Sequence, residues 1–249
     1  IFTKEIEDAL RRKEIDLAVH SLKDLPTELP HGLVIAAVPS REDARDVLVA
    51  RTKSKLAELP AGASIGTGSL RRRAQLLHRR SDITVVPVRG NIDTRLRKLD
   101  EGSTDALVLA AAGLKRLGRE AAITEYLPDE ICVSAVAQGA LAVESRDDAA
   151  LCERLSCLHD AATCTEVMAE RAFLDHLGGG CQVPIGARAR VDGPALRMIG
   201  VVASSDGSRL CRGEIFGSTS EAVPLGRRLA EQLLGEGADR LLEAIGVLT

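Results

Sequence analysis

The apolar and polar positions of residues 1–118 change repeatedly between a helical period and short apolar runs. In residues 3–13, Ile6, Ala9 and Leu10 share one face, which predicts an amphipathic helix. Strands that alternate with helices indicate an α/β fold with a mostly parallel sheet. The predicted strands lie at 15–22, 32–40, 46–50, 63–69, 83–90 and 105–113, and the further helices at 70–80, 91–102 and 114–118.

A different pattern begins near residue 160. Residues 160–177 predict a long amphipathic helix, and three glycines follow it. Consecutive strands followed by helices indicate a separate α+β domain with an antiparallel sheet. Its predicted strands lie at 185–191, 196–203 and 209–216, and its helices at 221–234 and 237–245.

The composition excludes several classes of function. A chain of 249 residues, 45% apolar and 28% charged, is typical of a soluble protein with two or three small domains. With no Trp, one Tyr and three Phe, it lacks the aromatic side chains of a base-stacking nucleic-acid surface. A net charge of −3 creates no general attraction for polyanions, so an anion site must be a local basic cluster. No apolar run has membrane-spanning length, and no signal peptide is recognisable.

The cysteines predict a reducing, cytoplasmic environment. Six are present, at 132, 152, 157, 164, 181 and 211, with neither Cys-x-x-Cys nor zinc-finger spacing. We therefore expect reduced thiols and no metal site. The chain starts at Ile1 and enters a helix almost at once, so we expect that an upstream strand or loop is missing.

The densest cluster of chemistry is "GTGSLRRR", residues 66–73. A strand ends, glycines turn the chain, and a helix begins with three arginines. Arginine at a helix N-terminus is mildly unfavourable unless an anion binds there. A solvated basic helix is the alternative, but the preceding Gly-Thr-Gly-Ser turn favours an anion site.

Two further strand ends repeat this arrangement. Arg89 closes the strand in "VRGNIDTRL", and Arg95 lies in the next helix. Arg116 follows a third strand in "AAGLKRLG". Ligands of open α/β sheets bind outside the carboxyl ends of strands, so the three ends together predict a basic cleft for a substrate with many carboxylates.

"HSLKDLP", residues 20–26, places Lys23 and Asp24 directly after an apolar strand. A solvated turn is the ordinary interpretation of such a pair. At the end of a buried strand, however, both can face the cleft, where a carboxylate can accept N–H donors or stabilise a developing cation. His20 alone is interpreted as a structural histidine.

"GGGCQVPIG", residues 178–186, presents Cys181 after three glycines. Gly178 is explained as the residue that ends the preceding helix. The other two glycines favour a cysteine on a loop at a domain boundary, although a buried thiol without covalent function remains the alternative.

The motifs "HSLKDLP", "GTGSLRRRAQL", "VRGNIDTRLRKL", "AAGLKRL", "AVAQGALAVE" and "GGGCQVPIGA" occur in this order. In these six motifs and their order, the whole chain resembles the porphobilinogen deaminase (hydroxymethylbilane synthase) family. The resemblance implies a transferase of tetrapyrrole biosynthesis that joins four porphobilinogen molecules head to tail, with loss of ammonia. It also implies a dipyrromethane cofactor held by a thioether bond to Cys181.

The resemblance also implies roles for individual residues. Asp24 would be the catalytic carboxylate, which holds pyrrole N–H groups and stabilises the cationic azafulvene. The residues implied to bind the cofactor are Lys23, Asp24, Ser69, Arg71 and Arg72, with Ser21 and Thr67 as less certain contacts. Those implied to bind substrate carboxylates are Arg89, Arg95 and Arg116, with Gln138 less certain.

The architecture implied by the resemblance is two α/β domains like the lobes of type II periplasmic binding proteins, plus a C-terminal α+β domain with a three-stranded antiparallel sheet. The expected ranges are 1–39 with 140–158, 44–134, and 161–249. The family's first strand and lid loop would precede Ile1. A monomer without nucleic-acid or membrane partners is expected.

Two competing interpretations remain at this stage. A two-lobed anion-binding module would need neither Cys181 nor Asp24 beside Lys23. An inactive, truncated homologue would retain the motifs without turnover. A covalent adduct on Cys181 distinguishes the enzyme from both.

Overall fold

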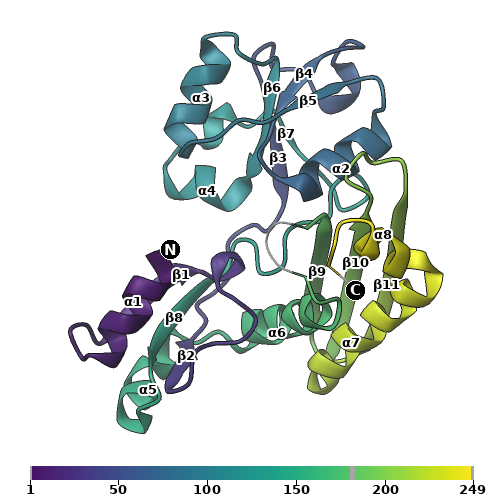
Figure 1. Cartoon of the computed structure of the whole chain (residues 1–249). Coiled ribbons are helices and arrows are strands. Elements are labelled where there is room, and N and C mark those ends of the chain that lie inside the picture. Colours follow the sequence, from purple (N-terminus) through teal and green to yellow (C-terminus); the bar gives the residue numbers. More distant parts are fainter. Residues whose placement is uncertain (1, 180–182, 248–249) are drawn as a thin grey trace.

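The computed structural model describes residues 2–179 and 183–247, which form one five-stranded and two three-stranded sheets (Figure 1). The five-stranded sheet lies at the top of Figure 1, and the two smaller sheets lie below it. Both views place helix α6 (Ala161–His176) between the two smaller sheets.

The first small sheet combines two distant parts of the chain. Its strand order is β1–β8–β2, and β8 lies antiparallel to both neighbours. The sequence pattern predicted the two outer strands but neither β8 nor the helix after it. The elements are β1 (Leu17–Ser21), β2 (Leu33–Ala37), β8 (Leu141–Arg146), α1 (Phe2–Arg11) and α5 (Ala149–Leu155).

The five-stranded sheet has the order β5–β4–β6–β3–β7. Strand β4 pairs in parallel with β5 and β6, so the carboxyl ends of these three strands share one edge. The helix that follows each of them starts at this edge. The strands are β3 (Asp46–Ala50), β4 (Ser64–Gly66), β5 (Thr84–Val86), β6 (Ala106–Ala110) and β7 (Glu125–Tyr126), and the helices are α2 (Leu70–Arg79), α3 (Ile92–Asp100) and α4 (Ala111–Arg116).

The prediction of a mostly parallel sheet needs a correction, because the five-stranded sheet is mixed and the described pairs of the first small sheet are antiparallel. In these two sheets, four of the six described strand pairs are antiparallel. One strand in each sheet runs against the others: β8 in the small sheet and β3 in the large one. Each is the first strand formed after the chain crosses from one sheet to the other, and hydrophobic periodicity does not report such a crossing.

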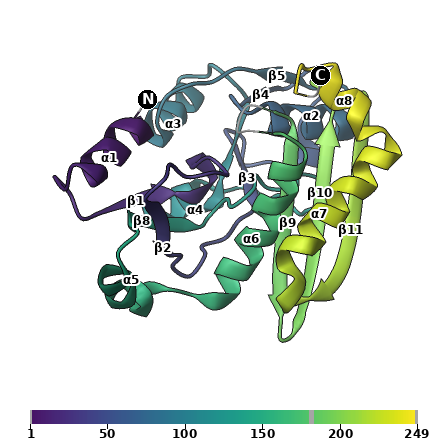
Figure 2. The same ribbon diagram turned by 60° about the horizontal axis from the view of Figure 1, so that its bottom comes forward.

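The C-terminal sheet is antiparallel with the order β11–β10–β9, as predicted. Helices α6 and α7 lie on one face of it (Figure 2). The fully buried ring of Phe173 packs over Gly200. A Cβ atom at position 200 would lie 2.7 Å from this ring, so only glycine fits there without moving the ring. The elements are β9 (Ile185–Asp192), β10 (Ala195–Ala203), β11 (Leu210–Ser218), α7 (Ala222–Leu233) and α8 (Asp239–Glu243).

Local helix signals are confirmed where the sequence contained them. The Asn91 side chain accepts a hydrogen bond from the Thr94 N–H at 2.9 Å and caps α3. Gly178 follows α6 with φ +64°, the left-handed conformation that glycine adopts without strain. Within the described part of the chain, no helix has both the length and the apolar character required to cross a bilayer.

Candidate functional site

Two adjoining cavities lie beside the shared edge of β4, β5 and β6. The larger has a volume of about 720 Å³ and the smaller about 210 Å³. Lys23, Arg72, Arg95 and Gln138 line both. The predicted site residues that line one or both cavities are Ser21, Lys23, Asp24, Ser69, Arg71, Arg72, Arg89, Arg95, Arg116 and Gln138.

Among the described residues, one predicted site residue, Thr67, does not line either cavity. Thr67 is buried behind the turn, and its Oγ1 accepts a hydrogen bond from the Ser69 N–H at 3.2 Å. Cys181 lies outside the described residues. Val183 and Ile185, which follow it in the chain, line the larger cavity.

Helix α2 brings two arginines into the protein interior at its first turn. Ser69 caps the helix, and its Oγ accepts a hydrogen bond from the Arg72 N–H at 3.4 Å. The capped turn directs both arginine side chains inward, and Arg71 and Arg72 are only 4% and 7% exposed. Ser69 and Thr67 therefore shape the turn that presents the arginines.

The buried partner of both arginines is Asp46, the first residue of β3. Arg71 Nη1 donates to Asp46 Oδ2 at 2.7 Å, and Arg72 Nε donates to Asp46 Oδ1 at 2.9 Å. Burial disfavours the ionised carboxyl group of Asp46. The positive charges of Arg71 and Arg72 nevertheless outweigh burial and hold its pKa well below its ordinary value. The anion expected at the start of α2 is thus supplied in part by the protein itself.

Sequence reasoning missed Asp46. It opens the apolar run "DVLVA", and a single carboxylate at the start of a buried strand was the one available indication. Its arginine partners lie 25 and 26 residues further along the chain, so no local spacing connects them.

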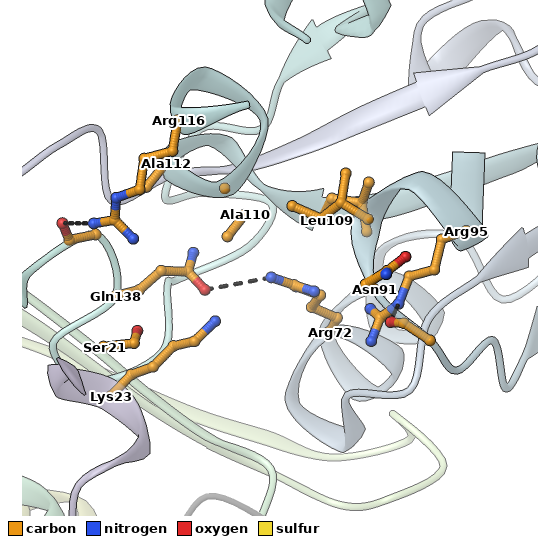
Figure 3. A pocket seen from close by; sticks show the side chains of 14 residues that line it. Ser21, Lys23, Arg72, Asn91, Arg95, Leu109, Ala110, Ala112, Arg116 and Gln138 are labelled. Atoms are coloured by element: carbon orange, nitrogen blue, oxygen red, sulfur yellow. Dashed lines mark hydrogen bonds between the residues drawn. The ribbon is translucent and has the colours of Figure 1, made fainter. Parts of the chain in front are cut away.

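Gln138 completes this buried network, and Figure 3 shows its bond to Arg72. Its Nε2 donates to Asp46 Oδ1 at 2.8 Å and to the Ala44 carbonyl at 2.7 Å, while its Oε1 accepts from Arg72 Nη2 at 3.3 Å. The preceding residue, Ala137, has φ +57°, a conformation unusual for a side chain other than glycine. Glu170 of α6 holds that residue by accepting its N–H at 2.6 Å.

Further cations surround the cavities. Arg95 Nε donates to the Gly90 carbonyl at 2.7 Å, and Arg116 Nη2 donates to the Gly139 carbonyl at 3.2 Å. Lys23 extends toward Gln138 and Arg72 in Figure 3. Burial lowers the pKa of the Lys23 ammonium group, and the nearby charge of Arg72 lowers it further. The cavities therefore attract anions, carboxylates above all.

Asp24 is the carboxylate that lines the larger cavity among these cations. It is exposed and ends a short 3₁₀ turn, Leu22–Asp24, that follows β1. The chain after it is fastened to α6, because the Arg171 guanidinium donates to the carbonyls of residues 25, 26 and 27. An exposed carboxylate at a fixed position can stabilise a cation that forms in the cavity.

Another titratable pair lies outside this site. His20 Nε2 lies 2.9 Å from Glu144 Oε2, in agreement with a structural role for His20. No group of three or more His, Cys, Asp or Glu side chains suited to a metal ion occurs within residues 2–179 and 183–247.

Comparison with known proteins identifies similar sequences over almost the whole chain. The family model described as "Porphobilinogen deaminase, dipyromethane cofactor binding domain" matches residues 1–154, and that described as "Porphobilinogen deaminase, C-terminal domain" matches residues 164–235. The porphobilinogen deaminase of Pelotomaculum thermopropionicum is 54% identical over 244 residues, which are 98% of this chain and 78% of that protein. That of Syntrophotalea carbinolica is 51% identical over 249 residues, 99% of this chain and 79% of that protein.

Solved structures give a weaker similarity. A putative methionine-binding lipoprotein from Bacillus subtilis is 16% identical, with a TM-score of 0.42, over 63% of this chain and 75% of that one. A periplasmic binding protein from Salmonella typhimurium with high arginine specificity is 21% identical, with a TM-score of 0.38, over 64% of this chain and 70% of that one.

Proposed function

Because the chain belongs to the porphobilinogen deaminase family, we propose that its two cavities hold the cofactor and the substrate of that reaction. The enzyme is a transferase that condenses four porphobilinogen molecules to hydroxymethylbilane and releases ammonia at each step. The observation that carries the assignment of the site is the group of arginine and lysine side chains around one exposed carboxylate, Asp24.

The residues of the larger cavity suit the dipyrromethane cofactor of the family. Each of its two pyrrole rings bears an acetate and a propionate, and the cavity offers Lys23, Arg71, Arg72 and Arg89 for them. Ser69 would contribute a hydroxyl group. Thr67, predicted as a less certain contact, would act through the Ser69 turn that it holds, and Ser21 would contribute from the smaller cavity. When bound through Cys181, the cofactor supplies the pyrrole carbon on which the product chain is built.

The smaller cavity suits the carboxylates of the incoming substrate. Arg95 and Arg116 reach it from α3 and α4, and Gln138 and Lys23 close its inner side. The hydrogen bonds of Arg95 and Arg116 to main-chain carbonyls fix where their guanidinium groups lie. Arginines oriented in this way bind two-oxygen anions with defined geometry.

Asp24 would act on the charge that develops as ammonia leaves the substrate. Its carboxylate would accept the pyrrole N–H and stabilise the positive charge of the ring. Surrounding cations hold the substrate by its carboxylates, so the carboxylate of Asp24 is directed at the reacting ring.

The three sheets would be the cores of three domains, 1–39 with 140–158, 44–134, and 161–249. A monomer in the cytoplasm is the state that we propose. The cytoplasmic location is supported by Cys132, Cys152, Cys157, Cys164 and Cys211, which are free thiols, as expected in a reducing compartment.

The covalent link is tested by the intact mass of the denatured protein beside its Cys181→Ala variant. We expect the unchanged chain to carry the extra mass of two linked pyrrole units and the variant to carry none. Cys157→Ala, which removes an exposed thiol, is the matched control and should retain the added mass. An unmodified mass in the unchanged chain would favour an anion-binding module or an inactive homologue.

We expect the KM for porphobilinogen to rise at alkaline pH. The rise should begin at a lower pH than it would if Lys23 had the ordinary pKa of a lysine. The lowered pKa of Lys23 means that its positive charge is present below that pKa and is lost as the pH rises through it. Without the charge, substrate carboxylates lose one partner. The test is the KM between about pH 7 and 10, compared with Lys23→Arg, whose charge persists. The same alkaline rise in both proteins would assign it to another group.

A further inference from the structure

A buried carboxylate connects the parts of the cavity wall that come from different elements. Asp46 of β3 is 0% exposed, yet it accepts hydrogen bonds from Arg71, Arg72 and Gln138. The two arginines come from α2, and Gln138 comes from the segment that crosses to the small sheet. A fourth partner, the thiol of Cys132, donates to Asp46 Oδ2 at 3.3 Å. Neither Asp46 nor Cys132 is among the described residues that line the cavities, so Asp46 acts on them through Arg71, Arg72 and Gln138.

The partners are also fastened to the main chain around Asp46. Arg71 Nη1 donates to the Val133 carbonyl at 2.6 Å, and Arg72 Nη1 donates to the Val108 carbonyl at 3.2 Å. Among the described residues, all the hydrogen bonds of the Arg71 guanidinium use Nη1. The guanidinium is planar, so the bonds of Nη1 also fix the direction in which its Nε–H and Nη2 groups point.

We propose that Asp46 is a positioning residue that presents Arg71, Arg72 and Gln138 to the cavities as one rigid unit with a net charge of +1. Two guanidinium charges and one carboxylate charge give this sum. The unit then attracts a carboxylate without the repulsion that two adjacent, uncompensated arginines would suffer. This inference rests on the proposed function of the cavities and adds a residue that sets their geometry and charge.

The test is Asp46→Asn in the full chain. KM and kcat for porphobilinogen are measured, and kcat is calculated per cofactor-loaded molecule. Intact mass gives the fraction of molecules that are loaded. Asparagine retains the shape but turns an NH₂ donor toward guanidinium donors, so the arginines lose their fixed orientation. We expect the KM to rise about tenfold or more with kcat changed less than about threefold, the pattern of lost uniform binding.

Charge and positioning predict opposite results in this experiment. The substitution raises the charge of the unit from +1 to +2, so attraction alone would lower the KM. A role confined to folding would lower the denaturation midpoint and leave the KM of the loaded molecules unchanged. A lowered or unchanged KM therefore overturns the proposal.

The matched control is Asp129→Asn, which breaks a similarly formed pair with Arg188 at 2.9 Å outside both cavities. Its KM should equal that of the unchanged chain. A tenfold rise in this control as well would overturn the proposal, because the effect would then follow from the loss of any internal ion pair.

A second measurement needs no variant of Asp46 and no turnover. In NMR spectra of the unchanged protein, the Nε–H group of Arg72, which donates to Asp46 Oδ1 at 2.9 Å, should give a signal that exchanges slowly with water. Its neighbour Arg73 is exposed and serves as the internal reference. Exchange at Arg72 as fast as at Arg73 would overturn the positioning role even if Asp46→Asn does not fold. Absence of turnover in the unchanged chain would instead count against the proposed function alone.

Discussion

Asp24→Ala should lower kcat by roughly 10²–10³-fold, the usual consequence of losing one electrostatic stabiliser of a transition state. The side chain is exposed and lines the larger cavity, so its removal leaves the packing of the small sheet unchanged. The cations that hold carboxylates also remain. We therefore expect the variant to fold and to carry the dipyrromethane cofactor, which intact mass will show. Single-turnover assays on the loaded protein measure the chemical step directly.

The control for Asp24 is Asp147→Ala, which removes another exposed carboxylate, directly after β8 and outside both cavities. It should leave kcat and KM unchanged. A normal kcat and a normal KM in Asp24→Ala would contradict the catalytic assignment. A normal kcat with a raised KM would instead indicate that Asp24 only binds the substrate.

The basic cleft could be predicted because its information is local. Arg71, Arg89 and Arg116 each lie near the end of an apolar strand, and β4, β5 and β6 are parallel neighbours in the sheet. For parallel neighbours, the carboxyl ends meet at one edge whatever the rest of the topology is. The strands and helices after residue 160 were predictable for a similar reason, since each has its own period and turn residues.

The features that could not be predicted depend on contacts between distant segments. Strand β8 completes the first sheet from more than 100 residues along the chain, where it pairs Val143 with Val19. Asp46 reads as the polar edge of an apolar strand until α2 brings two arginines against it. Since both contacts join segments that are distant in the sequence, hydrophobic periodicity contains no record of them.

Arg71→Leu should yield a protein that is poorly loaded with cofactor and less stable. The guanidinium is 4% exposed and shares Asp46 with Arg72. Removing one partner of a buried ion pair costs roughly 3–5 kcal/mol, and we expect the lower end because Arg72 remains. Cofactor carboxylates would also lose a guanidinium fork at the start of α2. Intact mass measures the loaded fraction, and chemical denaturation measures the free energy of unfolding.

Loss of stability alone could reduce loading, so a matched variant is needed. Arg188→Leu removes an arginine whose side chain is 12% exposed and paired with Asp129 at 2.9 Å, outside both cavities. It should lower the free energy of unfolding by a comparable amount and still be fully loaded. If both variants are loaded to the same extent, Arg71 contributes to the fold and not to cofactor binding. If only Arg71→Leu is isolated without the added mass, the Arg71 guanidinium binds both Asp46 and the cofactor.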